Sequence, residues 1–148
     1  MGVQHLLLQA IQDTPAVWVD TLDAHGNVTF WNLGAEQLSG YSRRDVLGHD
    51  RVWQWLYPDP DYRASIVARA TAIIERGDSV VDFETRVRTK DGTDRIISWN
   101  SHSVLDAQGR PAGSIAVGEG LKISGHILAC LSREPEFEAL DLSTALFF

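Results

Sequence analysis

Alternating hydrophobic and polar positions mark several short segments of the chain, and one longer segment with helical spacing separates them into two groups. Five segments have the pattern typical of strands: 16–22, 27–31, 79–89, 93–105 and 113–118. The long helix is expected over residues 60–76, with Tyr62, Ile66, Ala70 and Ile73 on one face. Two strands, several helices and then three strands predict an α+β fold, in which an antiparallel sheet carries helices packed on one face.

Turns of one type connect the strands within each group. Asp23–Gly26 and Asp106–Gly109 each open with Asp and close with Gly, and Asp91-Gly92 marks a third reversal. Asp bonds its own backbone in such turns and Gly tolerates a positive φ, so both favour tight connections between antiparallel neighbours. The sequence therefore predicts two blocks of hairpin-connected strands.

Capping residues predict where the helices between these blocks begin and end. Asn32 can cap a helix over residues 33–39 because its side chain can accept a bond from a free backbone N–H. Asp59 precedes Pro60, which costs nothing at the first helical position, and Gly77 ends the same helix. The region between the two blocks is therefore expected to be helical.

The alternation also predicts which side chains of the strands face the core. The expected inward positions are Val17, Val19, Val81, Phe83, Thr85, Val87, Ile97, Trp99, Ser101 and Ser114. Trp18 lies between Val17 and Val19, so it is expected to point outward.

Composition and charge exclude several classes of partner. The net charge of −7 comes without a basic patch, which argues against nucleic acid and against an anionic membrane surface. No apolar run approaches the roughly 20 residues that span a bilayer, and the N-terminus lacks the features of a signal peptide. The lone Cys130 cannot form an internal disulfide and fits a reducing compartment. A cytoplasmic location is expected.

Residues 16–119 resemble the PAS family of sensory domains in the order and spacing of their motifs. The matching elements are Asn27–Phe30, Asn32…Glu36…Gly40-Tyr41-Ser42, Val46-Leu47-Gly48, Lys90-Asp91-Gly92 and Asp106…Gly109-Arg110. The resemblance implies a five-stranded antiparallel sheet that cups a small cavity closed by helices. It also implies a role in bacterial signal transduction, with a homodimer and a signalling effector domain or protein, such as a histidine kinase, as expected partners.

Two segments flank residues 16–119. Residues 1–15 are expected to form a flanking helix over 3–13 that ends before Pro15. Residues 120–148 depart from the family's usual ending, since Gly120 stands where an Asp is common. Three alternatives stay open for this tail: it docks on the domain, it joins a dimer partner, or it is the remnant of a truncated reading frame.

The resemblance allows known ligand chemistries to be compared with the residues present. Photoactive flavin domains of the LOV type carry Asn-Cys-Arg where this chain has Asp50-Arg51-Val52, so the adduct-forming thiol is missing. Haem PAS domains often use a His on the long helix, which has none here, and His49 is expected to be solvated. Non-covalent flavin, a small organic acid and an empty packed core remain open.

Aromatic and small polar side chains on the expected inner face form a candidate ligand pocket. Its members are Trp53, Trp55, Phe83, Ile97, Trp99, Ser101 and Ser114. The indoles could stack on a planar ring and the hydroxyls could orient it. The alternative is that these aromatics fill an ordinary core.

A ligand-free interaction module is the competing function. Its dimer seam would consist of Leu6, Leu7, Ile11 and the outward Trp18. Catalysis is not expected, because no nucleophile, metal or nucleotide motif is present and the expected inner face offers no buried Asp or His. The sequence thus predicts a sensor of a small ligand or of redox state, or a ligand-free dimerisation module, rather than an enzyme.

Overall fold

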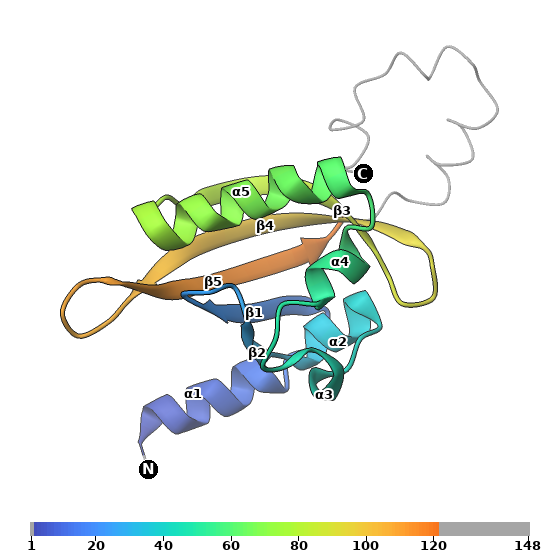
Figure 1. The fold of residues 1–148 in the computed structure, drawn as a ribbon. Coiled ribbons are helices and arrows are strands. Elements are labelled where there is room, and N and C mark those ends of the chain that lie inside the picture. The colour runs from blue at the N-terminus through green and yellow to red at the C-terminus, as the bar shows by residue number, and fades with distance from the viewer. Residues whose placement is uncertain (1, 122–148) are drawn as a thin grey trace.

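One antiparallel sheet organises residues 2–121, the part of the chain that the computed structural model describes (Figure 1). Its strands are β1 (Val17–Asp23), β2 (Val28–Trp31), β3 (Val80–Arg88), β4 (Asp94–Leu105) and β5 (Pro111–Gly120). Their order across the sheet is β2-β1-β5-β4-β3. β1 therefore pairs with β5, from Val17 opposite Glu119 to Asp23 opposite Gly113. This pairing joins the two blocks of strands into a single curved wall.

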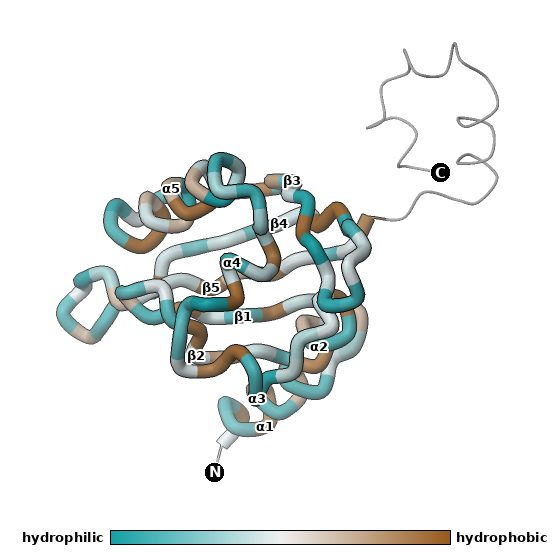
Figure 2. Tube along the Cα trace, turned by 45° about the vertical axis from the view of Figure 1, so that its right-hand side comes forward, coloured by the Kyte–Doolittle hydropathy of each residue, from teal (hydrophilic) through white to brown (hydrophobic). Residues whose placement is uncertain are grey.

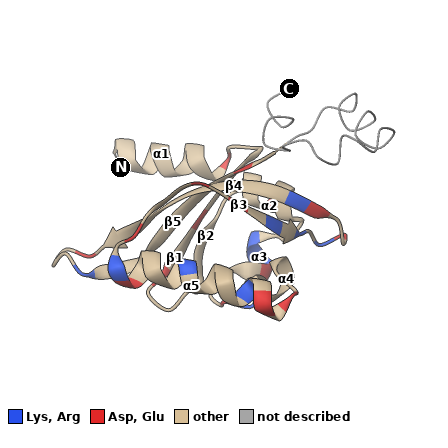
Figure 3. Cartoon of the chain, turned by 90° about the horizontal axis from the view of Figure 1, so that it is seen from above, with Lys and Arg blue, Asp and Glu red and all other residues tan. Residues whose placement is uncertain are grey.

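Five helices accompany the sheet within the described residues. They are α1 (Val3–Gln12), α2 (Leu33–Ser39), α3 (Arg43–Val46), α4 (Val52–Leu56) and α5 (Pro60–Arg76). α5 packs across β4 and β5, and α4 lies beside it on the same face of the sheet, whereas α1 lies on the opposite side (Figure 3). The expected α+β class is confirmed, and none of these helices is long and apolar enough to cross a bilayer.

The helix boundaries follow the capping residues closely. Asp59 accepts a bond from the backbone N–H of Asp61 at 3.2 Å, and Gly77 ends α5 with φ of 72°. Hydrophobic and hydrophilic positions alternate along α5, as Figure 2 shows, so one side can face the sheet while the other meets water.

Asn32 is the junction between β1, α2 and the end of α1. Its side chain is fully buried, and its Oδ1 accepts bonds from the backbone N–H groups of Ala35 at 2.9 Å and Val19 at 2.8 Å. Its Nδ2 donates to the carbonyl oxygens of Ile11 at 3.0 Å and Val17 at 2.9 Å. A residue expected only to cap a helix thus also ties the N-terminal helix to the sheet.

Two expectations about sidedness were wrong. Trp18 was expected to point outward, yet it is fully buried and its ring lies 5.0 Å from Trp31 and 5.1 Å from Trp99. Val81 was expected to face the core, yet 69% of it is exposed, because the register of β3 shifts between Val80 and Phe83. Trp18 therefore cannot belong to a dimer seam.

The core depends on small residues placed opposite large ones. Gly118 pairs with Trp18 on one side and with Trp99 on the other, so the two indoles meet edge to face across the strand between them. A Cβ on Gly118 would lie 2.6 Å from the Trp99 ring. The indoles of Trp18 and Trp99 therefore fill the space above Gly118, and these three residues form the tryptophan row of the sheet.

The expected division into a flanking helix, a domain and a tail stays a prediction. α1 occupies most of residues 1–15. Cys130 and nearly all of the tail 120–148 lie outside the described residues.

Candidate functional site

An inner cavity of about 80 Å³ lies between α5 and the sheet. Its sheet side is formed by Asp20, Leu22, Thr85, Trp99, Ser101, Ser114 and Ala116, and Ile66, Ala70 and Ile73 face it from α5. The space exists because Ala116 pairs with Asp20 on one side and with Ser101 on the other, a row of small side chains next to the tryptophan row. The side chains of this row therefore leave a cavity above the sheet, whereas those of Trp18 and Trp99 fill the space above the next row.

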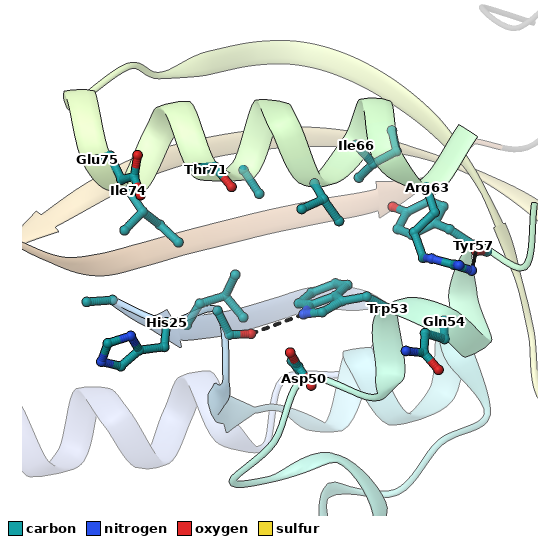
Figure 4. Close-up of a pocket in the computed structure, with 15 residues that line it drawn as sticks. His25, Asp50, Trp53, Gln54, Tyr57, Arg63, Ile66, Thr71, Ile74 and Glu75 are labelled. Carbon is teal, nitrogen blue, oxygen red and sulfur yellow. Dashed lines mark hydrogen bonds between the residues drawn. The ribbon is translucent and has the colours of Figure 1, made fainter. Parts of the chain in front are cut away.

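A wider outer cleft of about 450 Å³ adjoins this cavity (Figure 4). Leu22, Trp53, Tyr57, Ile66 and Ala70 border both spaces. Trp53 lies across the cleft from α5, and its Nε1–H donates to the carbonyl of Gly26 at 3.1 Å. Together the two spaces fall within the roughly 300–1,000 Å³ of typical small-molecule sites.

Thr85 organises the polar groups on one side of the inner cavity. Its Oγ1 accepts a bond from Trp99 Nε1–H at 2.8 Å and shares a second bond with the hydroxyl of Tyr57 at 2.9 Å. Burial raises the pKa of Tyr57 above its usual value, so the phenol stays neutral. These three groups satisfy one another and fix the walls of the cavity.

Asp20 is a buried carboxyl group on the inner face of β1. Only 2% of it is exposed, and its Oδ2 accepts a bond from Trp18 Nε1–H at 2.7 Å. Burial raises the pKa of Asp20 from 3.8 to about 7, against the opposing effect of the Trp18 bond. The expectation that the inner face holds no buried Asp was wrong, because Asp20 shares its face with Trp18.

The structure brings together five of the seven residues expected in the pocket. Trp53, Phe83, Trp99, Ser101 and Ser114 border the inner cavity. Whether they contact a ligand stays a prediction.

The other two expected pocket residues lie elsewhere. Ile97 is fully buried in the core, and Trp55 packs on Tyr41 with their ring centres 5.1 Å apart. Neither borders the inner cavity or the outer cleft.

Sequence reasoning missed Asp20, Tyr57 and Thr85 as a polar group around one cavity. Thr85 was expected inward, but nothing in the sequence placed it against Tyr57. For Asp20 a signal existed, since Trp18 and Leu22 lie two positions away on either side and would share its face.

The geometry can be compared with the two cofactors that the resemblance raised. The inner cavity, at about 80 Å³, is too small to hold a flavin ring by itself, so a flavin would also need the adjoining outer cleft. His49 uses both ring nitrogens locally, since its Nδ1 accepts from the N–H of Arg51 at 3.1 Å and its Nε2 bonds the carbonyl of Asp45 at 2.8 Å. A haem ligated by His49 would need both bonds to rearrange.

Solved structures share this architecture at low sequence identity. A PAS domain from Colwellia psychrerythraea is 20% identical with a TM-score of 0.68, and the match covers 80% of this chain and 97% of that one. A domain of a sensory box sensor histidine kinase/response regulator from Geobacter sulfurreducens is 22% identical with a TM-score of 0.61, over 78% and 93% of the two chains. A LOV protein from Rhodobacter sphaeroides is 17% identical with a TM-score of 0.61, over 99% and 88%.

Sequence identities this low show the fold alone. The family of the chain is shown by a separate comparison with family models. No curated protein matches the chain. The model of the PAS fold matches residues 6–119, which include β1 to β4 and all of β5 except Gly120. The chain therefore belongs to the PAS family.

Proposed function

We propose that this chain is a sensory module that binds a small organic molecule in the inner cavity and relays its presence to a signalling partner. The observation that carries the proposal is the hollowed row Asp20–Ala116–Ser101, which places polar groups beneath an apolar helix and opens to a wider cleft. A core selected only for stability would fill that row, because voids and buried polar groups both cost free energy. Sensing a ligand thus explains a feature that packing does not.

The relay would run through β1. A ligand that contacts Asp20 acts on the strand whose neighbouring residue, Val19, is held by Asn32. Asn32 also holds the end of α1 through Ile11. A ligand with different affinities for two packings of this junction would shift their populations and so move the N-terminal helix.

We expect no catalysis and a cytoplasmic location. Among residues 2–121, Asp20 is the one carboxylate that borders the inner cavity, and no His of this part of the chain borders it. A paired acid and base, which most hydration and isomerisation reactions need, is therefore not assembled there.

Filling the cavity should abolish ligand binding. Ala70 borders both spaces, whereas Ala68 on the same helix is exposed. In Ala70→Phe, the ring would occupy the room that a ligand needs, and we expect the amount of co-purifying small molecule to fall at least about tenfold. The measurement is mass spectrometry of extracts from natively purified protein.

Ala68→Phe is the matched control, since it adds the same ring on the solvent side of α5. It should retain the co-purifying molecule. Equal amounts in wild type and Ala70→Phe, or none in wild type, would contradict the proposed function.

A homodimer formed through α1 is a second candidate function, favoured by the exposed leucines of that helix. Leu6 is 68% exposed and Leu7 is 58% exposed, whereas Ile11 is half-buried. Water-facing leucines at neighbouring positions of one helix are typical of a surface that a partner covers. With Trp18 removed from it, the proposed seam consists of Leu6, Leu7 and Ile11.

Charging this seam should separate the dimer. In Leu6→Glu/Leu7→Glu, two carboxylates would replace apolar contacts, and we expect the dimer to dissociate at least about tenfold more readily. Light scattering across a range of concentrations measures the mass. Gln9→Glu, also on α1, is the control for added charge, and an unchanged mass in the double variant would remove the idea.

A further inference from the structure

The carboxyl group of Asp20 is only partly satisfied. Its Oδ2 accepts the bond from Trp18, while Oδ1 receives no hydrogen bond from any residue between 2 and 121 and borders the inner cavity. A carboxylate has lone pairs for about four donors. Most of the accepting capacity of Asp20 is therefore directed at the empty space.

Asp20 also has no counter-ion among the residues that the structure describes. The ion pairs found there all lie at the surface and none includes Asp20. Arg69 is the one cation of the described residues that borders the inner cavity. It is exposed and stacks on Phe83, with its guanidinium carbon 4.4 Å from the ring centre. A buried acid without a cation is costly, and such groups are concentrated at functional sites.

Two further acceptors lie beside Asp20 on the same face of the sheet. Ser101 is opposite Ala116, which is itself opposite Asp20, and Ser114 is two residues from Ala116 along β5. Both serines are more than nine-tenths buried, and neither hydroxyl makes a hydrogen bond within residues 2–121. The three groups form a polar cluster on the sheet side of the cavity, in which the carboxylate accepts hydrogen bonds and the two hydroxyls can accept or donate them.

The surroundings of this cluster also favour positive charge. The rings of Trp53, Phe83 and Trp99 border the cavity, and aromatic faces attract ammonium and guanidinium groups. The outer cleft is bordered by the carboxylates of Asp50 and Glu75. Its one Arg or Lys side chain, Arg63, already donates to the carbonyl of Tyr57 at 2.9 Å.

We propose that the ligand is a small organic cation whose ammonium or amidinium group pairs with Asp20 and the hydroxyls of Ser101 and Ser114. The inner cavity of about 80 Å³ would hold this head group, and the apolar body of the ligand would extend past Trp53 into the outer cleft. The inference rests on the proposed function and names its ligand class.

A cation would supply what the cavity lacks. Its N–H donors would meet the free oxygen of Asp20 and compensate the charge of this largely buried carboxylate, since hydrogen bonds with an ionised partner are stronger than neutral ones. A carboxylate or phosphate would instead bring a second negative charge next to Asp20. A small organic acid, which the sequence left open, is therefore disfavoured.

Three probes of similar shape and different charge test the inference: 2-phenylethylammonium, 2-phenylethanol and 3-phenylpropionate. Each is titrated into the full chain near pH 8, and its dissociation constant is measured by ligand-observed NMR. We expect the ammonium probe to bind at least about tenfold more tightly than the alcohol, and the carboxylate more weakly than the alcohol. Equal affinities for the three probes, or no binding of the ammonium, would overturn the inference.

Two variants test whether the preference for the ammonium probe over the alcohol arises at the inner cavity. Asp20→Asn keeps the shape and an acceptor for Trp18, so the ammonium should lose its advantage over the alcohol while the alcohol still binds. Glu119→Gln removes one charge from an exposed side chain on the same sheet and should keep the advantage. A preference unchanged in Asp20→Asn would assign cation binding to another surface and overturn the inference.

The outcome is separable from that of the proposed function. A co-purifying molecule that disappears in Ala70→Phe would support ligand sensing even if the three probes bind equally. In that case the cavity has a ligand and the class inferred from Asp20 is wrong.

Discussion

Replacing Asp20 with Asn should stabilise the folded domain, with a gain that grows as the pH rises. The pKa of the Asp20 carboxyl is raised from 3.8 to about 7 by burial, so the folded protein holds a proton there that the unfolded chain has lost. Folding therefore becomes less favourable from about pH 4 upward and levels off above about pH 7. Asn carries no charge at any pH and avoids this loss.

The size of the effect follows from the shift of the pKa. Each unit corresponds to about 1.4 kcal/mol, so Asp20→Asn should gain about 4 kcal/mol over wild type near pH 8 and about 2 kcal/mol near pH 5. Urea denaturation followed by tryptophan fluorescence measures the free energy of unfolding of both proteins at each pH. Comparing them isolates Asp20 from the other carboxyl groups, which titrate in both.

The opposite dependence of stability on pH is expected for Asp94, a carboxyl group at the surface, and this residue provides the control. The Arg88 guanidinium beside Asp94 holds the pKa of that carboxyl below its usual value, so its small stabilising effect is lost as the pH falls. Asp94→Asn should therefore be no more stable than wild type near pH 8. A gain for Asp20→Asn that is the same at both pH values would show that the pKa of Asp20 is not raised, because its carboxyl would then be equally ionised in the folded and the unfolded protein.

Replacing Gly34 with Ala should destabilise the domain by about 3 kcal/mol or more. Gly34 is in the first turn of α2, and a Cβ there would lie 1.8 Å from the carbonyl oxygen of Val17 in β1. The obstacle is backbone, so no change of rotamer relieves it and α2 must move away from the sheet. Since total stabilities are about 5–15 kcal/mol, the loss should be evident in the urea midpoint or in the folded fraction.

The sign of the change in stability of Gly34→Ala shows whether close packing or helix propensity dominates at this position. Ala in place of Gly inside a helix with free space stabilises by roughly 0.5–1 kcal/mol, so a gain would show that α2 does not touch β1 at Gly34. Gly26→Ala is the matched comparison, because its φ is 85° and nothing lies within 4 Å of the added Cβ. It should cost only about 1–2 kcal/mol, the strain of the left-handed backbone.

The two variants have opposite signs because they affect features with different purposes. Gly34 is small because α2 and β1 must touch, and changing it can only harm the fold. Asp20 lowers the stability of the fold, since its buried carboxylate has no counter-ion among the described residues. A residue that lowers stability at neutral pH is one that function explains better than folding does.

Local chemistry made the elements of this protein predictable from its sequence. Gly77 ended α5 where expected, and Asp59 began it, because caps and turns depend on a few neighbouring residues. The hairpin turn at Asp23 formed as expected, with the carboxylate accepting bonds from the N–H groups of His25 and Asn27. The family was likewise evident from the order of such motifs.

The tertiary structure alone decided which face of each strand is the inner one. β1 has apolar side chains on both faces, so alternation could not choose between Val19 and Trp18, and both are buried. In β3 one extra residue shifts the register and moves Val81 to the surface. Choosing the wrong face for β1 concealed Asp20, because a slip of one residue exchanges every inward side chain for an outward one.

The sequence by itself determined the kind of fold, the limits of its elements and five of the residues around the cavity. It could not determine that Asp20, Ser101 and Ser114 border one cavity, since they come from three strands that are neighbours only once β1 lies beside β5. Periodicity describes one strand at a time, whereas a site depends on how strands are placed next to one another. The pairing of β1 with β5 is what places a buried carboxyl among aromatic rings.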